Sequence, residues 1–125
     1  MKVEVSNGEI IDKIIILTIK KEKIQDANKL KNITDELNIL LESLPEELNS
    51  LDKKYYNDLY NINLKLWEIE DKLREKEAKK EFDHEFIELA RKVYINNDKR
   101  AKIKYDINVL TFSNLIEEKQ HTQYE

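Results

Sequence analysis

The stretch "LNSLDKKYYNDLYNINLKLWEIEDKLR", residues 48–74, decides the fold of this chain. Its apolar residues recur every three or four positions, which is the spacing of one face of an α-helix. They are Leu48, Leu51, Tyr55, Leu59, Ile62, Leu66, Ile69 and Leu73. The spacing predicts one continuous helix over residues 46–80. At ~1.5 Å per residue this helix is roughly 50 Å long, so we expect an elongated molecule.

Three further segments have helical spacing and recognisable ends. They predict helices over residues 7–24, 28–43 and 84–112. Ser6 and Glu9 have capping-box spacing at the start of the first helix, and Asp83 is placed to cap the last one. Since the connections are short, neighbouring helices pair antiparallel. We therefore predict an all-α fold, an elongated bundle of about four helices. It consists of a long antiparallel hairpin of the third and fourth helices and a shorter hairpin of the first two.

The length of 125 residues fits one helical domain with a hydrophobic core of its own. Residues 1–5, "MKVEV", alternate apolar and polar side chains and predict a short extended arm. Residues 113–125 follow the last predicted helix and contain few apolar residues, so we expect a loose C-terminal tail.

Composition narrows the class of protein further. Hydrophobic residues make up 40% and charged residues 38% of the chain, which is typical of a folded globular domain. One Gly and one Pro leave too few turn residues for an all-β fold. The net charge of −4 gives no overall attraction to nucleic acid or to anionic lipid, so we expect neither as a partner.

The sequence also indicates in which cellular compartment the protein is found. The absence of Cys excludes disulfides and thiol chemistry, and it fits a reducing environment. The most apolar run, residues 14–19, is too short to span a membrane, and the first residues lack a secretory pattern. We expect a cytoplasmic protein.

Known cofactor and metal motifs are missing from the sequence. There is no glycine-rich phosphate loop and no HExxH, since the chain has one Gly and two His. Two Glu-x-x-His pairs, Glu81–His84 and Glu118–His121, have the ligand spacing of metal-binding bundles. They lie at opposite ends of the last helix, on the order of 50 Å apart, so one chain cannot combine them. We predict no metal and no cofactor.

One polar feature interrupts the pattern of the last helix. Its first half is apolar around Phe86, Ala90 and Val93, whereas the same face then continues with Lys104 and Asn108. The apolar centre turns by roughly a quarter turn, more than the ~20° per heptad that a straight helix drifts. Antiparallel pairing places Arg100 level with Asn63, so polar groups from two helices converge at one height. We call this set the polar seam, and its candidate ligand-binding residues are Asn63, Trp67, Glu70, Asn97, Arg100 and Lys104.

The polar seam can be structural, can bind a ligand, or can be a kink of the helix that has no role. It can set the register of the helices, as a buried Asn does in coiled coils, or reflect only a change of packing partner along the helix. Alternatively, it can form a small pocket in which Arg100 holds an anion and Asn97 orients it. A seam closed by Glu70 or another carboxylate favours the structural role, and a solvent-open pocket favours ligand binding.

Four stretches together carry a resemblance to a known family. They are "GEIIDKIIILTIKKEKI" (residues 8–24), "LWEIEDKLR" (66–74), "FIELARKVYINNDKRAKIKYDIN" (86–108) and "EEK" (117–119). They resemble a small bacterial and phage family catalogued as a domain of unknown function. The resemblance implies a free-standing small helical protein, and it supplies no activity and no site residues.

Two functional hypotheses remain open at this point. The first is a cytosolic helical interaction or structural protein that acts as a homodimer, with a protein partner possible. The second is a small all-helical enzyme or binder of an anionic metabolite, similar in architecture to chorismate-mutase-like dimers, with the anion held at Arg100. The chain has only three Arg, and its first helix lacks the Arg that such enzymes use, so the sequence favours a non-enzymatic role.

Overall fold

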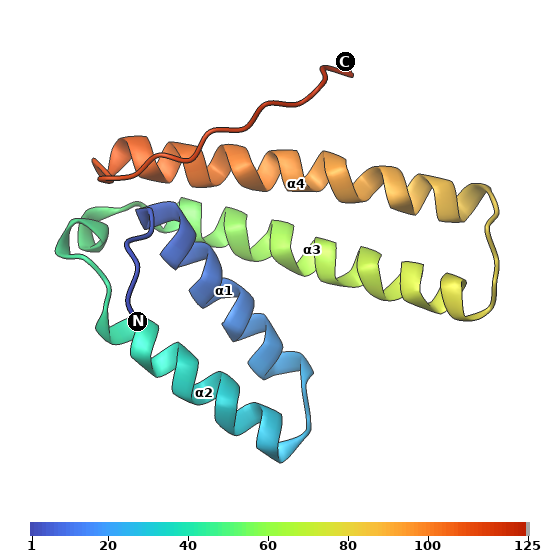
Figure 1. The fold of residues 1–125 in the computed structure, drawn as a ribbon, viewed down its shortest axis with the longest axis horizontal. Coiled ribbons are helices and arrows are strands. Elements are labelled where there is room, and N and C mark those ends of the chain that lie inside the picture. The colour runs from blue at the N-terminus through green and yellow to red at the C-terminus, as the bar shows by residue number, and fades with distance from the viewer. Residues whose placement is uncertain (125) are drawn as a thin grey trace.

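The computed structural model describes residues 1–124, and within them all regular structure is helical. The chain forms α1 (Asn7–Lys23), α2 (Ala27–Glu42), a 3-10 helix η1 (Glu46–Ser50), α3 (Lys53–Ala78) and α4 (His84–Leu110). Helices α3 and α4 form a long antiparallel hairpin, and α1 and α2 form a shorter one that crosses it (Figure 1). The predicted all-α fold and both hairpins are confirmed.

The predicted continuous helix over residues 46–80 is wrong. The chain is extended at Leu51, with φ −68° and ψ 133°, and this separates η1 from α3. The Asp52 carboxylate then accepts a hydrogen bond from the backbone N–H of Lys54 at 2.9 Å and caps α3. Helix α3 thus has 26 residues and is roughly 39 Å long. The two caps predicted from the sequence are present, because Ser6 accepts a hydrogen bond from Glu9 N–H at 3.1 Å and Asp83 accepts one from Phe86 N–H at 2.9 Å.

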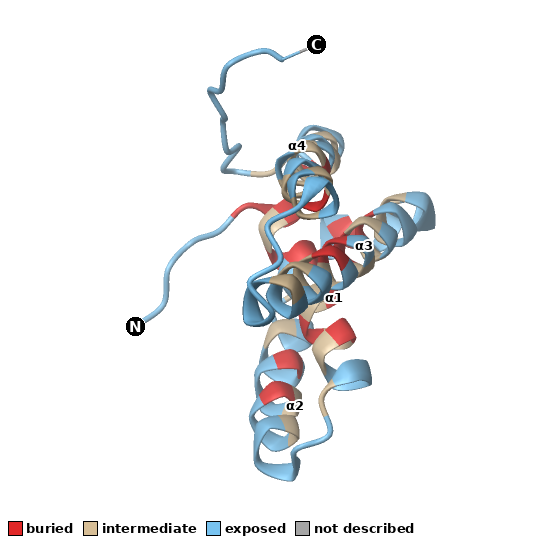
Figure 2. Cartoon of the chain, turned by 90° about the vertical axis from the view of Figure 1, so that its right-hand side faces the viewer, coloured by how far each residue is buried: buried red, intermediate tan, exposed pale blue. Residues whose placement is uncertain are grey.

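Helix α1 lies at the centre of the molecule and packs against α2, α3 and α4. One side of α1 contributes Ile11, Ile15 and Ile19 to a core that also contains Leu59 of α3 and Ile107 of α4. The other side places Leu17 against α2, where Ile33 and Leu37 are buried. Figure 2 shows the buried residues concentrated where α1 meets its neighbours. The broad apolar face of α1 therefore packs against the α3–α4 hairpin and against α2 at the same time.

The change of face along α4 has a direct cause in this packing. The N-terminal half of α4 packs on α3 and buries Leu89, while the C-terminal half also meets the N-terminal end of α1. There polar contacts lie beside the buried Ile107. Gly8 N–H donates to Asn108 Oδ1 at 2.6 Å, and Asn7 Nδ2 donates to Thr111 Oγ1 at 3.0 Å. The apolar stripe of the N-terminal half ends where α4 begins to contact the first turn of α1.

Gly8 is required at this contact because α1 and α4 come too close there for a side chain to fit. A Cβ at position 8 would lie 2.6 Å from the backbone oxygen of Lys104 and 3.0 Å from Asn108 Oδ1. Backbone atoms of a packed helix cannot move aside locally, so a side chain here forces α1 and α4 apart.

Among residues 1–124, no helix is both long and apolar enough to cross a membrane.

We predict that Gly8→Ala lowers the free energy of unfolding by about 1–3 kcal/mol, as overpacking does in well-packed contacts. Urea denaturation followed by circular dichroism measures the change. The control is Asn38→Ala at an exposed position of α2, where we expect a change within about 0.5 kcal/mol. Equal stability of Gly8→Ala and the wild type would contradict the close approach of α1 and α4.

Candidate functional site

The polar seam is centred on Asp12, a carboxylate of α1 that is 1% exposed. Arg100 Nε lies 3.0 Å and 3.2 Å from the two Asp12 oxygens, and Arg100 Nη2 donates a short hydrogen bond to Oδ2. Asn63 Nδ2 of α3 donates to Asp12 Oδ1 at 2.8 Å. One buried carboxylate of α1 therefore hydrogen-bonds to both α3 and α4. The Arg100 guanidinium compensates its charge through a bidentate contact.

Arg100 and Asn63 both contact Asp12, so they lie at the same height, as antiparallel pairing of α3 and α4 requires. Asn63 Nδ2 also donates to the Leu59 carbonyl at 3.0 Å, which holds its amide in place. Hydrogen bonding to Asp12 raises the pKa of Arg100 further above its usual value, so the guanidinium stays charged at every physiological pH.

A cavity of about 230 Å³ opens beside this network, between α1, α3 and α4. We call it the three-helix cavity. It is lined by Ile16, Ile19, Lys20, Asn63, Leu66, Trp67, Glu70, Asn97 and Arg100. Five of the six residues predicted for the polar seam line it, and Lys104 does not.

The polar groups around the three-helix cavity are mainly hydrogen-bond donors. Arg100 Nη1 has a single weak contact, 3.5 Å from Asn97 Oδ1. Within residues 1–124, the side-chain nitrogens of Lys20, Trp67 and Asn97 donate no hydrogen bond and form no ion pair. The one carboxylate on the lining is Glu70, which is 45% exposed and lies 3.9 Å from Arg74 Nη2.

Lys104 lies on the other side of Arg100, in a network of carboxylates. Its Nζ is 2.6 Å from Glu9 Oε2, 3.8 Å from Glu117 Oε2 and 3.9 Å from Asp12 Oδ2. Its side chain is 16% exposed, so these carboxylates largely neutralise its charge. Lys104 therefore stabilises the junction of α1, α4 and the tail.

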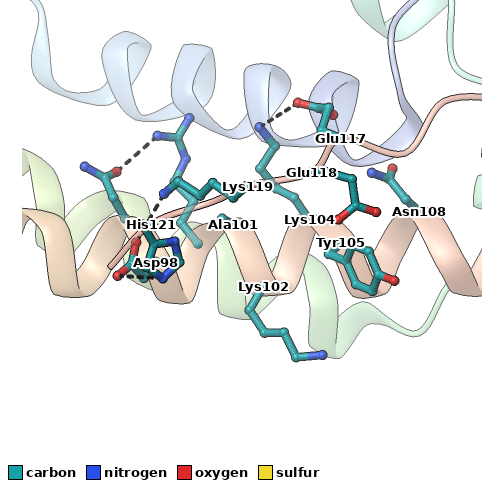
Figure 3. Close-up of a pocket in the computed structure, with 12 residues that line it drawn as sticks. Asp98, Ala101, Lys102, Lys104, Tyr105, Asn108, Glu117, Glu118, Lys119 and His121 are labelled. Atoms are coloured by element: carbon teal, nitrogen blue, oxygen red, sulfur yellow. Dashed lines mark hydrogen bonds and ion pairs between the residues drawn. The ribbon is translucent and has the colours of Figure 1, made fainter. Parts of the chain in front are cut away.

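A second, larger cavity of about 520 Å³ lies between α4 and the C-terminal segment (Figure 3), and we call it the tail cavity. Helix α4 contributes Asn97, Asp98, Arg100, Ala101, Lys102, Lys104, Tyr105 and Asn108. The C-terminal segment contributes Glu117, Glu118, Lys119 and His121. Asn97 and Arg100 line both cavities, so their side chains form the wall between them.

The segment predicted to be a loose tail has no helix or strand over residues 113–124, but it contacts α4. Asp98 accepts hydrogen bonds from Lys119 Nζ at 3.2 Å and Tyr124 Oη at 2.6 Å, and His121 Nε2 lies 3.9 Å away. The rings of Tyr94 and Tyr124 pack edge to face with centroids 5.3 Å apart. Glu117 accepts a short hydrogen bond from Ser6, which joins the tail to the start of α1.

Sequence reasoning missed Asp12, the central residue of the network. Asp12 lies within the apolar run of α1, directly after Ile11 and three residues before Ile15, and both of these are buried. A charged residue at such a position is a usable signal, because a carboxylate within a buried face needs a partner. Glu9, Asn108 and the tail residues were also missed, and their contacts join positions about 100 residues apart in several cases.

Within residues 1–124, no group of three or more His, Asp or Glu side chains is arranged to hold a metal ion.

A comparison with known families matches residues 1–124 to the model of a family of unknown function, DUF6165. The chain belongs to this family. The resemblance to a family of unknown function is thereby confirmed, and its bacterial and phage origin stays a prediction. No curated protein and no solved structure matches this DUF6165 chain. Two of the stretches that carry the resemblance, residues 86–108 and 117–119, supply most of the lining of the tail cavity.

The contacts of Asp98 predict a pH-dependent tail. Hydrogen bonding from Tyr124, with Lys119 and His121 nearby, lowers the pKa of Asp98 below its usual value. A carboxyl whose folded pKa is lowered stabilises the docked tail above its undocked pKa of about 3.9, and this contribution is lost as pH falls through the docked value. We expect NMR relaxation of residues 115–124 to show increased motion below about pH 4, while the α1 amides stay ordered.

Asp98→Asn tests the same contact at neutral pH. We expect this variant to have a mobile tail at pH 6, whereas Asp106→Asn, which removes the partner of Lys102 instead, leaves the tail unchanged. A tail that stays ordered in Asp98→Asn would show that Asp98 does not hold it.

Proposed function

We propose that this protein binds a small organic anion, a carboxylate with an apolar body, in the three-helix cavity. Four residues with donor groups, Lys20, Trp67, Asn97 and Arg100, all line one cavity. The proposal rests on the convergence of these donor side chains, of which, within residues 1–124, only Arg100 has protein acceptors, namely Asp12 and, in a weak contact of its Nη1, Asn97 Oδ1. Donors that converge on a concave site and lack protein acceptors are typical of sites that take an anion.

Asp12 acts in this proposal as a positioning residue. It binds Nε and Nη2 of Arg100, and so it fixes the plane of the guanidinium and leaves Nη1 directed toward Asn97 at the cavity. Because Asp12 compensates most of the charge of Arg100, the uncompensated positive charge at the cavity comes from Lys20. Arg100 contributes an oriented donor, and Lys20 contributes the electrostatic attraction.

The shape of the cavity and its one carboxylate restrict the class of ligand. Ile16, Ile19, Leu66 and the Trp67 ring supply apolar wall, so a ligand with an apolar body removes this surface from water. Glu70 repels a second negative charge, which disfavours dianions such as phosphate at neutral pH. A monocarboxylate of the size of benzoate fits both features.

The structural and the ligand-binding interpretations of the polar seam involve different nitrogens of the Arg100 guanidinium. The structural role involves Nε and Nη2, and the ligand-binding role involves Nη1. The inner edge of Arg100 is closed by Asp12, which sets the register of α1 against α4 whether or not a ligand is present. The remaining nitrogen, Nη1, lies 3.5 Å from Asn97 Oδ1, and both residues line the three-helix cavity. A register role therefore supports the ligand site by holding its donors in place.

Trp67 is the only Trp of the chain and lines the cavity, so its fluorescence reports binding directly. We predict that benzoate changes this emission saturably with a millimolar dissociation constant, a binding free energy of about −4 kcal/mol, and that phosphate binds more weakly. Lys20→Ala should weaken benzoate binding about tenfold, and Glu70→Gln should strengthen it because a repulsive charge is removed.

The matched control is Lys23→Ala, an exposed Lys in the last turn of α1 that does not line the cavity. It should bind benzoate as the wild type does. Unchanged Trp67 emission with benzoate, or an equal loss of affinity in Lys20→Ala and Lys23→Ala, would refute the proposed site.

A further inference from the structure

An apolar surface is exposed where α4 ends and the tail begins. Phe112 is the second residue after α4 and is 90% exposed, and it adopts a left-handed conformation with φ 53°. The other large apolar residues of this region are between 44% and 52% exposed. They are Val109, Leu110, Leu115 and Ile116. Five apolar side chains within eight positions are thus exposed to solvent. A single exposed apolar residue is common on protein surfaces, but a cluster of this size calls for an explanation.

The N-terminal arm extends this surface. Asn114 Nδ2 donates a hydrogen bond to Glu4 Oε1 at 3.1 Å, so the arm and the start of the tail lie next to each other. Val3 and Val5, on either side of Glu4 in the arm, are exposed as well. Figure 2 shows both terminal segments leaving the helices on the same side of the molecule. We call this surface the terminal patch. It consists of Val3, Val5, Val109, Leu110, Phe112, Leu115 and Ile116.

The exposed area of the chain is large for its mass. A compact monomer of 15.0 kDa has about 7,000 Å² of accessible surface. This chain exposes 9055 Å², so the excess is about 2,000 Å². A stable protein interface removes about 800 Å² from each partner. The excess is therefore enough to supply one partner's share of a stable dimer interface.

We propose that a second copy of this chain docks on the terminal patch and forms a two-fold homodimer. In a two-fold contact the same surface is used by both copies. Phe112 protrudes beside the apolar end of α4, so Phe112 of one copy can pack on the Val109 and Leu110 side chains of the other.

The charges around the patch support a second copy over a membrane. The arm carries Lys2 and Glu4, and Ile116 is followed in the tail by Glu117, Glu118 and Lys119. Mixed charges can pair across a two-fold axis, whereas a surface that binds anionic lipid needs an excess of Lys and Arg. This inference is independent of the anion site, since the terminal patch shares no residue with the three-helix cavity.

Sedimentation velocity over a series of protein concentrations tests the proposal. We expect the wild type to change from monomer to dimer as concentration rises. Phe112→Asn should raise the dimer dissociation constant at least tenfold. Asn tolerates the left-handed backbone at this position, so the variant keeps the local conformation.

The matched control is Ile39→Asn, which removes an exposed apolar side chain of α2, where Ile39 is 63% exposed and lies outside the terminal patch. It should dimerise as the wild type does. A wild type that stays monomeric at every concentration, or an equal loss in both variants, would overturn the proposal. Binding of the monomer to phosphatidylserine vesicles, abolished by Phe112→Asn, would assign the patch to a membrane instead.

Discussion

The structure depends on one buried ion pair, Asp12 with Arg100. A carboxylate that is 1% exposed carries a large desolvation penalty, which is acceptable only with a charged partner in good geometry and further hydrogen bonds. Arg100 supplies the charge from α4, and Asn63 supplies an additional donor from α3. Both must reach the same point on α1, so the pair determines how the two hairpins cross.

Several other features follow from that crossing. The first turn of α1 comes so close to α4 that residue 8 has no room for a Cβ, and polar contacts of Lys104, Asn108 and Thr111 lie beside the buried Ile107 there. Asp12 holds the guanidinium through Nε and Nη2, and Arg100 lines a cavity together with Lys20, Trp67 and Asn97. The same interaction therefore supports both the packing of α1 against α4 and the proposed anion site.

Apolar periodicity was sufficient to predict the helices and their pairing, because a 3.6-residue pattern records which face each helix buries. It could not show the interruption at Leu51. Leu51 fits the apolar periodicity of the helix although its backbone is extended. In the sequence, Asp52 cannot be distinguished from a charged residue on the exposed face of a helix, and only its hydrogen bond to Lys54 N–H identifies it as a cap. Arg100 and Asn63 were found because helix pairing fixes their relative height. Asp12 and Glu117 were not found. Their partners depend on how the hairpins cross and on where the tail runs, and local sequence patterns do not contain this information.

A double-mutant cycle between Asp12→Leu and Arg100→Met, with urea unfolding as the measurement, shows how strongly the buried pair stabilises the fold. Arg100→Met leaves a buried carboxylate uncompensated and should cost about 3–5 kcal/mol, whereas the double variant removes both charges and should be more stable than Arg100→Met alone. The exposed pair Lys102–Asp106 provides the comparison, with an expected coupling of about 0.5 kcal/mol or less. Additive effects of the two substitutions, with a double variant less stable than either single one, would contradict the account.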